Sequence, residues 1–228
     1  MTHAAQPTEK DELLGKLLPV LAARGLVRRW AESQTPYSDL SAECVLLSSD
    51  PSLRLEFGDY LRASPIIQQT VHTLLSHLAM VTSFRWQDVP MPARLVAQHG
   101  SMIGRWLPTF LIIDGPLGRF LRAIDSPLNI LLRTQHARYP VLAQARDLFN
   151  HDLFRRVRNG VGHWSFAFQQ QDAIERLVCF DWESGERTAE VSIIEAETLH
   201  LASFSIIECL DQELFRHANP KAKSALRE

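Results

Sequence analysis

A basic stretch around residues 155–163 holds side chains whose types can act on a phosphodiester. Arg155, Arg156 and Arg158 lie within one predicted helical turn, and guanidinium groups bind phosphate through paired donors while staying charged. Asn159 follows them, and His163 comes four residues later. The imidazole of a histidine takes or gives a proton near neutrality. Together these residues predict a site that holds and cleaves a phosphodiester.

For RNA, the imidazole would activate a ribose 2′-hydroxyl or protonate the leaving 5′-oxygen, while Arg158 stabilises the charge that develops on phosphorus. This chemistry requires no metal and no cofactor. Helical spacing predicts that Arg155, Asn159 and His163, four residues apart, share one face. Arg158 and His163 instead lie about 140° apart around an ideal helix. Either the helix is distorted at its two glycines, or Arg158 reaches across on its long side chain.

Arg158, Asn159, three intervening residues and His163 resemble the Arg, polar residue, short spacer and His motif of HEPN domains. The resemblance implies an all-helical bundle that forms a homodimer, in which the motifs of two chains build one composite site. It also implies that Arg158 and His163 are catalytic and that Asn159 orients or hydrogen-bonds. Beside them we assign Arg155 and Arg156 to substrate binding.

Many HEPN proteins are metal-independent endoribonucleases in toxin–antitoxin, phage-defence or RNA-processing systems, and others are noncatalytic partners. The resemblance thus implies an RNA substrate and an antitoxin or defence partner. Two other interpretations stay open. In one, the chain is a noncatalytic helical module for protein interaction. In the other, Gly162 and His163 only end a helix, where glycine is preferred and a cation favourably meets the helix dipole.

Hydrophobic periodicity predicts a mainly α-helical fold with a small antiparallel β-hairpin or meander before the C-terminal helix. We divide the chain into a helical N-terminal region, 1–115, to which we assign no role, and a HEPN-like domain with a hairpin insertion, 116–228. The alternative is that both parts form one compact domain.

In the first half, Thr8 followed by Asp11 and Glu12 predicts a capped helix that Gly25 ends. Its predicted apolar face is formed by Leu13, Leu14, Leu17, Leu18 and Leu21. A second helix is predicted between Pro36 and Pro51, with Ser38 as its cap.

The strongest helical period of the first half covers residues 64–84. Between residues 87 and 118, interrupting prolines and glycines predict two short helices instead.

In the second half, residues 117–133 and 140–160 are predicted as two helices that pack antiparallel. Three segments rich in aromatic and β-branched residues then predict strands, and Ser184 with Gly185 predicts a hairpin turn between the last two. A long amphipathic helix closes the chain and turns inward Leu199, Phe204, Ile207, Leu210 and Leu214.

Composition argues against some classes of function. The chain is 46% hydrophobic and 22% charged with a net charge of −2, so contact with a nucleic acid requires a local basic patch. Cys44, Cys179 and Cys209 are few and widely spaced, which predicts reduced core thiols in a cytoplasmic protein. The sequence contains no signal-peptide pattern and no apolar run long enough for a membrane span, so we expect no membrane contact.

Several other candidate residues favour a structural interpretation. His72 and His77 lack further ligands at usable spacing, so no metal site is expected. The aromatic and arginine pairs around Trp86 and Trp106 are more typical of core anchors with arginines at the rim than of base-stacking residues. Asp152, one turn before the second arginine of the basic stretch, is expected to pair with it. Phosphate-loop, nucleophile-elbow and zinc-protease motifs are absent from the sequence.

Overall fold

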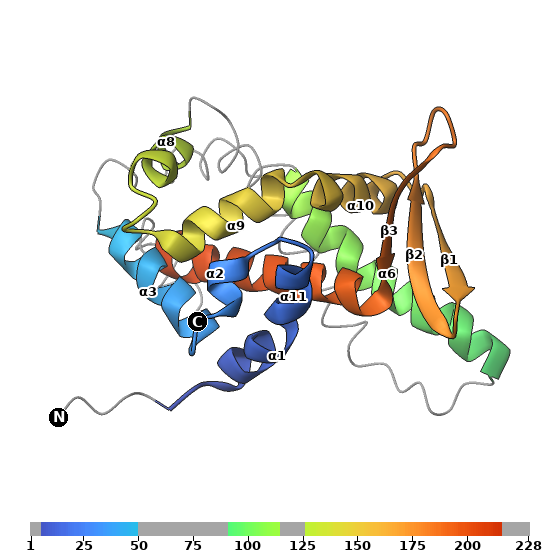
Figure 1. Cartoon of the computed structure of the whole chain (residues 1–228), viewed down its shortest axis with the longest axis horizontal. Helices are drawn as coiled ribbons and strands as arrows, with labels where there is room; N and C mark the ends of the chain where they lie inside the picture. Colours follow the sequence, from blue (N-terminus) through green and yellow to red (C-terminus); the bar gives the residue numbers. More distant parts are fainter. Residues whose placement is uncertain (1–5, 50–90, 115–125, 216–228) are drawn as a thin grey trace, which may run out of the picture.

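The computed structural model of the chain describes residues 6–49, 91–114 and 126–215 (Figure 1). In this part the fold is mainly helical, with a three-stranded antiparallel sheet before the last helix, which confirms the predicted fold class. The elements, in chain order, are α1 (Glu9–Ala23), α2 (Arg28–Ala31), α3 (Pro36–Ser48), α6 (Met91–Asp114), α8 (Pro127–Thr134), α9 (Pro140–Asn150), α10 (Asp152–Gly162), β1 (Phe166–Gln171), β2 (Ile174–Phe180), β3 (Arg187–Ser192), α11 (Ile193–Cys209) and the π-helix η2 (Leu210–Phe215).

Helix α1 begins with the predicted capping box, in which Thr8 and Asp11 each accept a backbone N–H of the other. Its buried leucines recur at helical spacing and pack into the core: Leu14, Leu18 and Leu21. Leu13, predicted on the same face, is instead 44% exposed because a helix buries only one stripe of its surface. Gly25, with a φ of 78°, follows the helix end as predicted.

Asp11 also joins α1 to α3. Its carboxylate accepts the backbone N–H groups of Tyr37 and Ser38, both at 2.9 Å, and the Ser38 hydroxyl at 2.8 Å. The predicted cap at Ser38 is therefore wrong: α3 begins earlier, at Pro36, whose fixed φ suits a first helical position. The hydroxyl of Ser38 is directed to Asp11 rather than to its own helix.

Helix α6 is one continuous helix in the region where we predicted two short helices. It passes two glycines and Pro108 because its buried face, including Trp106 and Phe110, packs against α10 and α11. Glu197 of α11 accepts hydrogen bonds from Arg105 at 2.8 Å and from the Trp106 indole at 2.6 Å. Trp106 is thus the core anchor that was predicted. The predicted helix 64–84, with His72, His77 and Trp86, lies outside the described residues.

The single helix predicted over 140–160 is two helices, α9 and α10, that meet at His151 (Figure 1). His151 has an extended backbone, with φ −67° and ψ 138°, and its side chain accepts the N–H of Leu153. It therefore ends α9 and caps α10 at one residue. Of the helix predicted over 117–133, the structure describes α8 only, and 115–125 lie outside the described residues.

The strands follow the order β1-β2-β3, each antiparallel to its neighbour. Asp172 and Ala173, with φ values of 50° and 62°, form the tight turn between β1 and β2. The predicted turn at Ser184 and Gly185 joins β2 to β3, and Gly185 has a φ of 72°. In Figure 1 the sheet lies at one end of the helices, and both α10 and α11 pack against this sheet.

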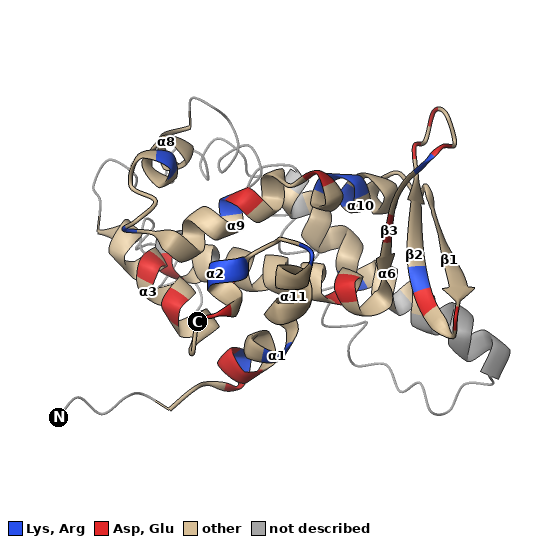
Figure 2. Cartoon of the chain, in the orientation of Figure 1, with Lys and Arg blue, Asp and Glu red and all other residues tan. Residues whose placement is uncertain are grey.

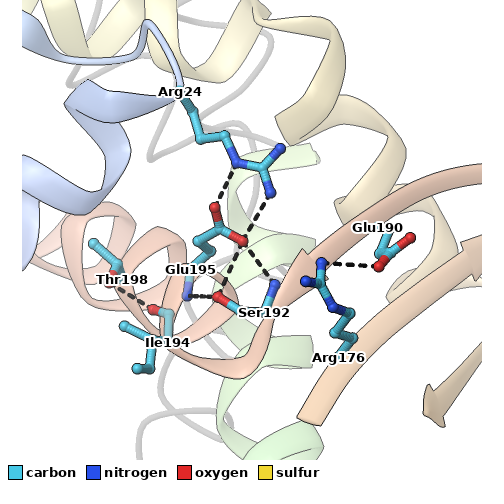
Figure 3. Close-up of polar contacts among 7 residues, drawn as sticks. All are labelled: Arg24, Arg176, Glu190, Ser192, Ile194, Glu195 and Thr198. Carbon is cyan, nitrogen blue, oxygen red and sulfur yellow. Dashed lines mark hydrogen bonds and ion pairs between the residues drawn. The ribbon is translucent and has the colours of Figure 1, made fainter. Parts of the chain in front are cut away.

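Helix α11 starts with a second capping box, formed by Ser192 and Glu195. Arg24, at the end of α1, donates to both carboxylate oxygens of Glu195, at 2.5 and 3.0 Å (Figure 3). The first and last parts of the described chain are thereby joined. Most residues that we predicted on the inner face of this helix are buried, namely Leu199, Ile207 and Leu210, and Phe204 is half-buried. Leu214 lies outside the described side chains.

One buried core contains residues from before and after position 115, from α1 to η2. The predicted boundary at 115/116 lies at the edge of the undescribed residues 115–125 and stays a prediction. The three cysteines are free and buried, as predicted. Within the described ranges, every helix is too short or too polar to cross a bilayer.

Candidate functional site

A pocket of about 400 Å³ lies between α10, the end of β2, the β2–β3 loop and β3. It is lined by Arg155, Arg156, Asn159, His163, Phe180, Asp181, Trp182, Glu183 and Thr188. Four of the five residues that we predicted for the site are in this set. The fifth, Arg158, is not.

Helix α10 presents one face to this pocket and the opposite face to the core. Its buried residues include Phe154, Val157 and Val161, which hold the helix against its neighbours. Arg155, Asn159 and His163 lie on the pocket side, so the shared face predicted from their spacing of four is confirmed. The β2–β3 hairpin supplies the other wall, because α10 packs against both of these strands.

The two pocket arginines are held by one carboxylate. Arg155 and Arg156 each contact a different oxygen of Asp152 at 2.6 Å, which confirms the predicted Asp152–Arg156 pair. Arg156 also donates to the Thr188 carbonyl at 3.0 Å. The hydrogen bond from Arg155 lowers the pKa of Asp152 below its ordinary value, so this carboxylate stays ionised. In Figure 2 these charges appear as a red turn followed by a blue one on α10.

The loop side of the pocket is acidic. The carboxylate of Asp181 accepts the N–H groups of Glu183 at 3.0 Å and Ser184 at 2.8 Å, and these bonds lower its pKa. Asp181 therefore organises the loop in which we predicted a hairpin turn. With Glu183, it gives the pocket two carboxylates against two guanidinium groups. The pocket is consequently close to neutral, so it is not the local basic patch that we expected for contact with a nucleic acid. Its hydrogen-bonding groups, rather than its net charge, distinguish it.

His163 stacks on Trp182, with ring centroids 6.0 Å apart and an interplanar angle of 18°. Both residues are exposed, Trp182 by 64%. The sequence interpretation missed Trp182, because it placed this residue at the end of a strand and not beside the histidine. Positions 163 and 182 meet only when the hairpin folds back on the end of α10, a contact that no local pattern encodes.

Arg158 is buried, with 8% of its surface exposed. Its Nε and Nη2 atoms donate to the Oδ1 atom of Asn159 at 3.3 and 3.0 Å. The helix continues undistorted through Gly160, so Arg158 and His163 remain on different sides of it. The guanidinium thus contacts a pocket residue, Asn159, without lining the pocket itself.

The two glycines of the motif differ in role. A Cβ atom at Gly160 would lie 2.5 Å from the Cys179 Cβ, so only glycine lets α10 approach β2 this closely. At Gly162 the same atom would meet nothing within 4 Å. The residue that adopts the left-handed conformation after the helix is Trp164, with a φ of 55°. The helix-end interpretation is correct as geometry, since α10 ends at Gly162 and His163 occupies the C-cap.

In the part of the chain that the structure describes, no three His, Cys, Asp or Glu side chains are grouped as they would be around a metal ion. No family model, curated protein or solved structure matches this chain.

Proposed function

We propose that this chain is a metal-independent endoribonuclease of the HEPN type. The observation that carries the proposal is the meeting of His163, Asn159, Arg155 and Arg156 around one pocket that also contains an exposed indole. An imidazole, an amide and two guanidinium groups are the side chains that phosphodiester cleavage uses when no metal supplies the charge.

Cleavage requires two proton transfers. The ribose 2′-hydroxyl loses a proton as its oxygen attacks phosphorus, and the departing 5′-oxygen gains one, which leaves a 2′,3′-cyclic phosphate and a 5′-hydroxyl. In each chain His163 performs one of these transfers. The guanidinium groups of Arg155 and Arg156 bind the phosphate oxygens, and Trp182 offers a surface on which a base stacks.

Arg158 has a positioning role in this proposal. Its two hydrogen bonds hold the Asn159 carbonyl oxygen, which turns the amide N–H₂ of that residue toward a substrate oxygen. The resemblance to HEPN domains implies a dimer in which Arg158 contributes to a composite site. Arg158 can do so only if the dimer interface brings it to the site of the second copy.

A homodimer completes the site, because each pocket holds one imidazole while the reaction needs an acid and a base. The exposed tryptophans near His163 are suited to cover by a second copy, since Trp164 is 67% and Trp182 64% exposed. The proposal includes a toxin–antitoxin or phage-defence setting with an antitoxin or defence partner, which rests on the family resemblance alone.

The test is cleavage of single-stranded RNA in EDTA by the purified chain and by His163→Ala. We expect loss of at least about a hundredfold in rate for the variant, since general acid–base catalysis contributes roughly 10²–10⁴-fold. The matched control is His136→Ala, an exposed histidine between α8 and α9, which should cleave as the unchanged chain does. Folding is checked by thermal unfolding, and retained cleavage by a folded His163→Ala protein refutes the assignment.

A second function is favoured by the position of Arg158. Because its guanidinium is buried beside Asn159 and does not line the pocket, the same surface also suits a noncatalytic module that binds a protein through its exposed tryptophans. This function predicts no RNA cleavage by the purified chain. It also predicts a stable complex that Trp164→Ala or Trp182→Ala weakens, while His163→Ala leaves it intact.

A further inference from the structure

A second pocket, of about 460 Å³, lies between α2, α8, the α8–α9 link and α9. It shares no lining residue with the pocket at His163. The residues that line it are Arg29, Leu132, Arg133, His136, Pro140, Ala143, Gln144, Arg146 and Asp147. Figure 2 shows basic residues on each of the three helices.

The charge of this pocket is positive. Three guanidinium groups, those of Arg29, Arg133 and Arg146, face a single lining carboxylate, Asp147. Arg146 is the one that pairs with Asp147, through its Nε atom at 3.0 Å and through Nη2. Across the described ranges, no carboxylate forms an ion pair with Arg29 or Arg133. The lining therefore retains about two positive charges even with His136 neutral.

Arg146 is largely buried, with 17% of its side chain exposed. Its Nη1 atom is buried and has no hydrogen-bond partner among the described residues. A buried donor on a charged group is destabilising when it stays unsatisfied, so an acceptor placed against it would stabilise it. This second feature, independent of the charge count, also favours an anionic ligand.

The start of α9 does not supply the attraction. The first free N–H groups of this helix, at Val141 and Leu142, donate to the Glu43 carboxylate of α3 at 2.9 and 2.8 Å. Glu43 does not line the pocket. The arginine side chains, which come from three different helices, are thus the groups that would bind a ligand.

We propose that this pocket binds a small molecule that carries two or more linked phosphate groups. Guanidinium groups pair with phosphate oxygens through two donors each, and their spread over α2, α8 and α9 suits several phosphates better than one. The volume falls in the range of roughly 300–1,000 Å³ typical of small-ligand sites. Leu132, Pro140 and Ala143 provide an apolar wall for the rest of the ligand. This inference does not depend on the proposed ribonuclease function.

The experiment is isothermal titration calorimetry of the full chain with inorganic triphosphate, pyrophosphate and orthophosphate at fixed ionic strength. We expect triphosphate to bind more tightly than orthophosphate, and Arg29→Ala and Arg133→Ala each to weaken triphosphate binding about tenfold or more. Both side chains are exposed, so the variants should fold, which thermal unfolding checks.

Arg28→Ala is the matched control, because Arg28 neighbours Arg29 on α2, is 82% exposed and lies outside the pocket. It should bind triphosphate as the unchanged chain does. The proposal is overturned if triphosphate does not bind, or if Arg28→Ala weakens binding as much as Arg29→Ala. It is also overturned if neither pocket variant weakens binding. None of these outcomes bears on RNA cleavage.

Discussion

At the scale of single residues, Gly160 and Gly162 show that identical residue types in one motif serve different ends. Gly160 allows α10 to lie against the Cβ and Sγ atoms of Cys179 on β2. Gly162 has open space around it and an ordinary backbone. The left-handed conformation that often selects glycine falls instead on Trp164, whose backbone N–H donates to Val161 at 3.2 Å in the turn that ends α10.

The glycine pair makes a matched prediction. Gly160→Ala should lower the free energy of unfolding by about 1–3 kcal/mol, because the new methyl group overlaps Cys179 and the helix must move from the sheet. Gly162→Ala should leave it unchanged or raise it by up to about 1 kcal/mol, since alanine favours the helix. Urea unfolding of both variants measures the difference, and equal effects would contradict the close contact between α10 and β2.

At the scale of elements, Asp11 shows how one side chain caps its own helix and anchors another. It completes the capping box of α1 and accepts two backbone N–H groups at the start of α3. Burial by itself raises the pKa of Asp11, but hydrogen bonds from Thr8 and Ser38 outweigh it and lower the pKa to about 2. The ionised carboxylate is therefore part of the folded state.

The low pKa predicts how stability depends on pH. Because the folded-state pKa lies below the ordinary value of 3.8, the carboxylate stabilises the fold fully above about pH 4, and the contribution is lost as the pH falls toward about 2. Asp11→Asn should lower the free energy of unfolding by about 2 kcal/mol near neutral pH. The loss should become progressively smaller as the pH falls from about 4 toward about 2. Urea unfolding across this range measures it, with Glu12→Gln, an exposed acid one residue on, as the control. A difference that does not narrow with acid would rule out this role.

At the scale of the whole molecule, the proposed site requires a second copy. His163 is exposed at the end of α10, and Trp164 and Trp182 are exposed beside it, so this end of the molecule presents aromatic surface. Two chains that meet here would bring two imidazoles to one phosphodiester, which supplies both the acid and the base that cleavage needs.

A cross-link tests this arrangement. In a His163→Cys variant, a short thiol-specific cross-linker should join the introduced thiols of two chains. The native cysteines should not react, because they are at most 1% exposed. His136→Cys, at an exposed position between α8 and α9, should give little dimer under the same conditions. Denaturing gels show the product, and a protein that stays monomeric with both variants would exclude the composite site.

Local physical chemistry let the sequence predict much of the fold. Capping residues and leucine spacing predicted α1, and short β-branched segments predicted the meander. A spacing of four residues predicted that Arg155, Asn159 and His163 share one face of a helix. Where the prediction for α6 was wrong, a distant contact decided, because packing of Trp106 carries the helix through Pro108. The division of 140–160 has a local cause, because the side chain of His151 caps a new helix at Leu153.

The sequence by itself therefore determined the helical class, the meander and the shared face of α10, because these depend on residues within a few positions of one another. Only the tertiary structure decided which side chains meet. It set Trp182 against His163, buried Arg158 beside Asn159, and gathered Arg29, Arg133 and Arg146 around one pocket. Contacts across long sequence separations depend on how the whole core packs, and no local pattern specifies that.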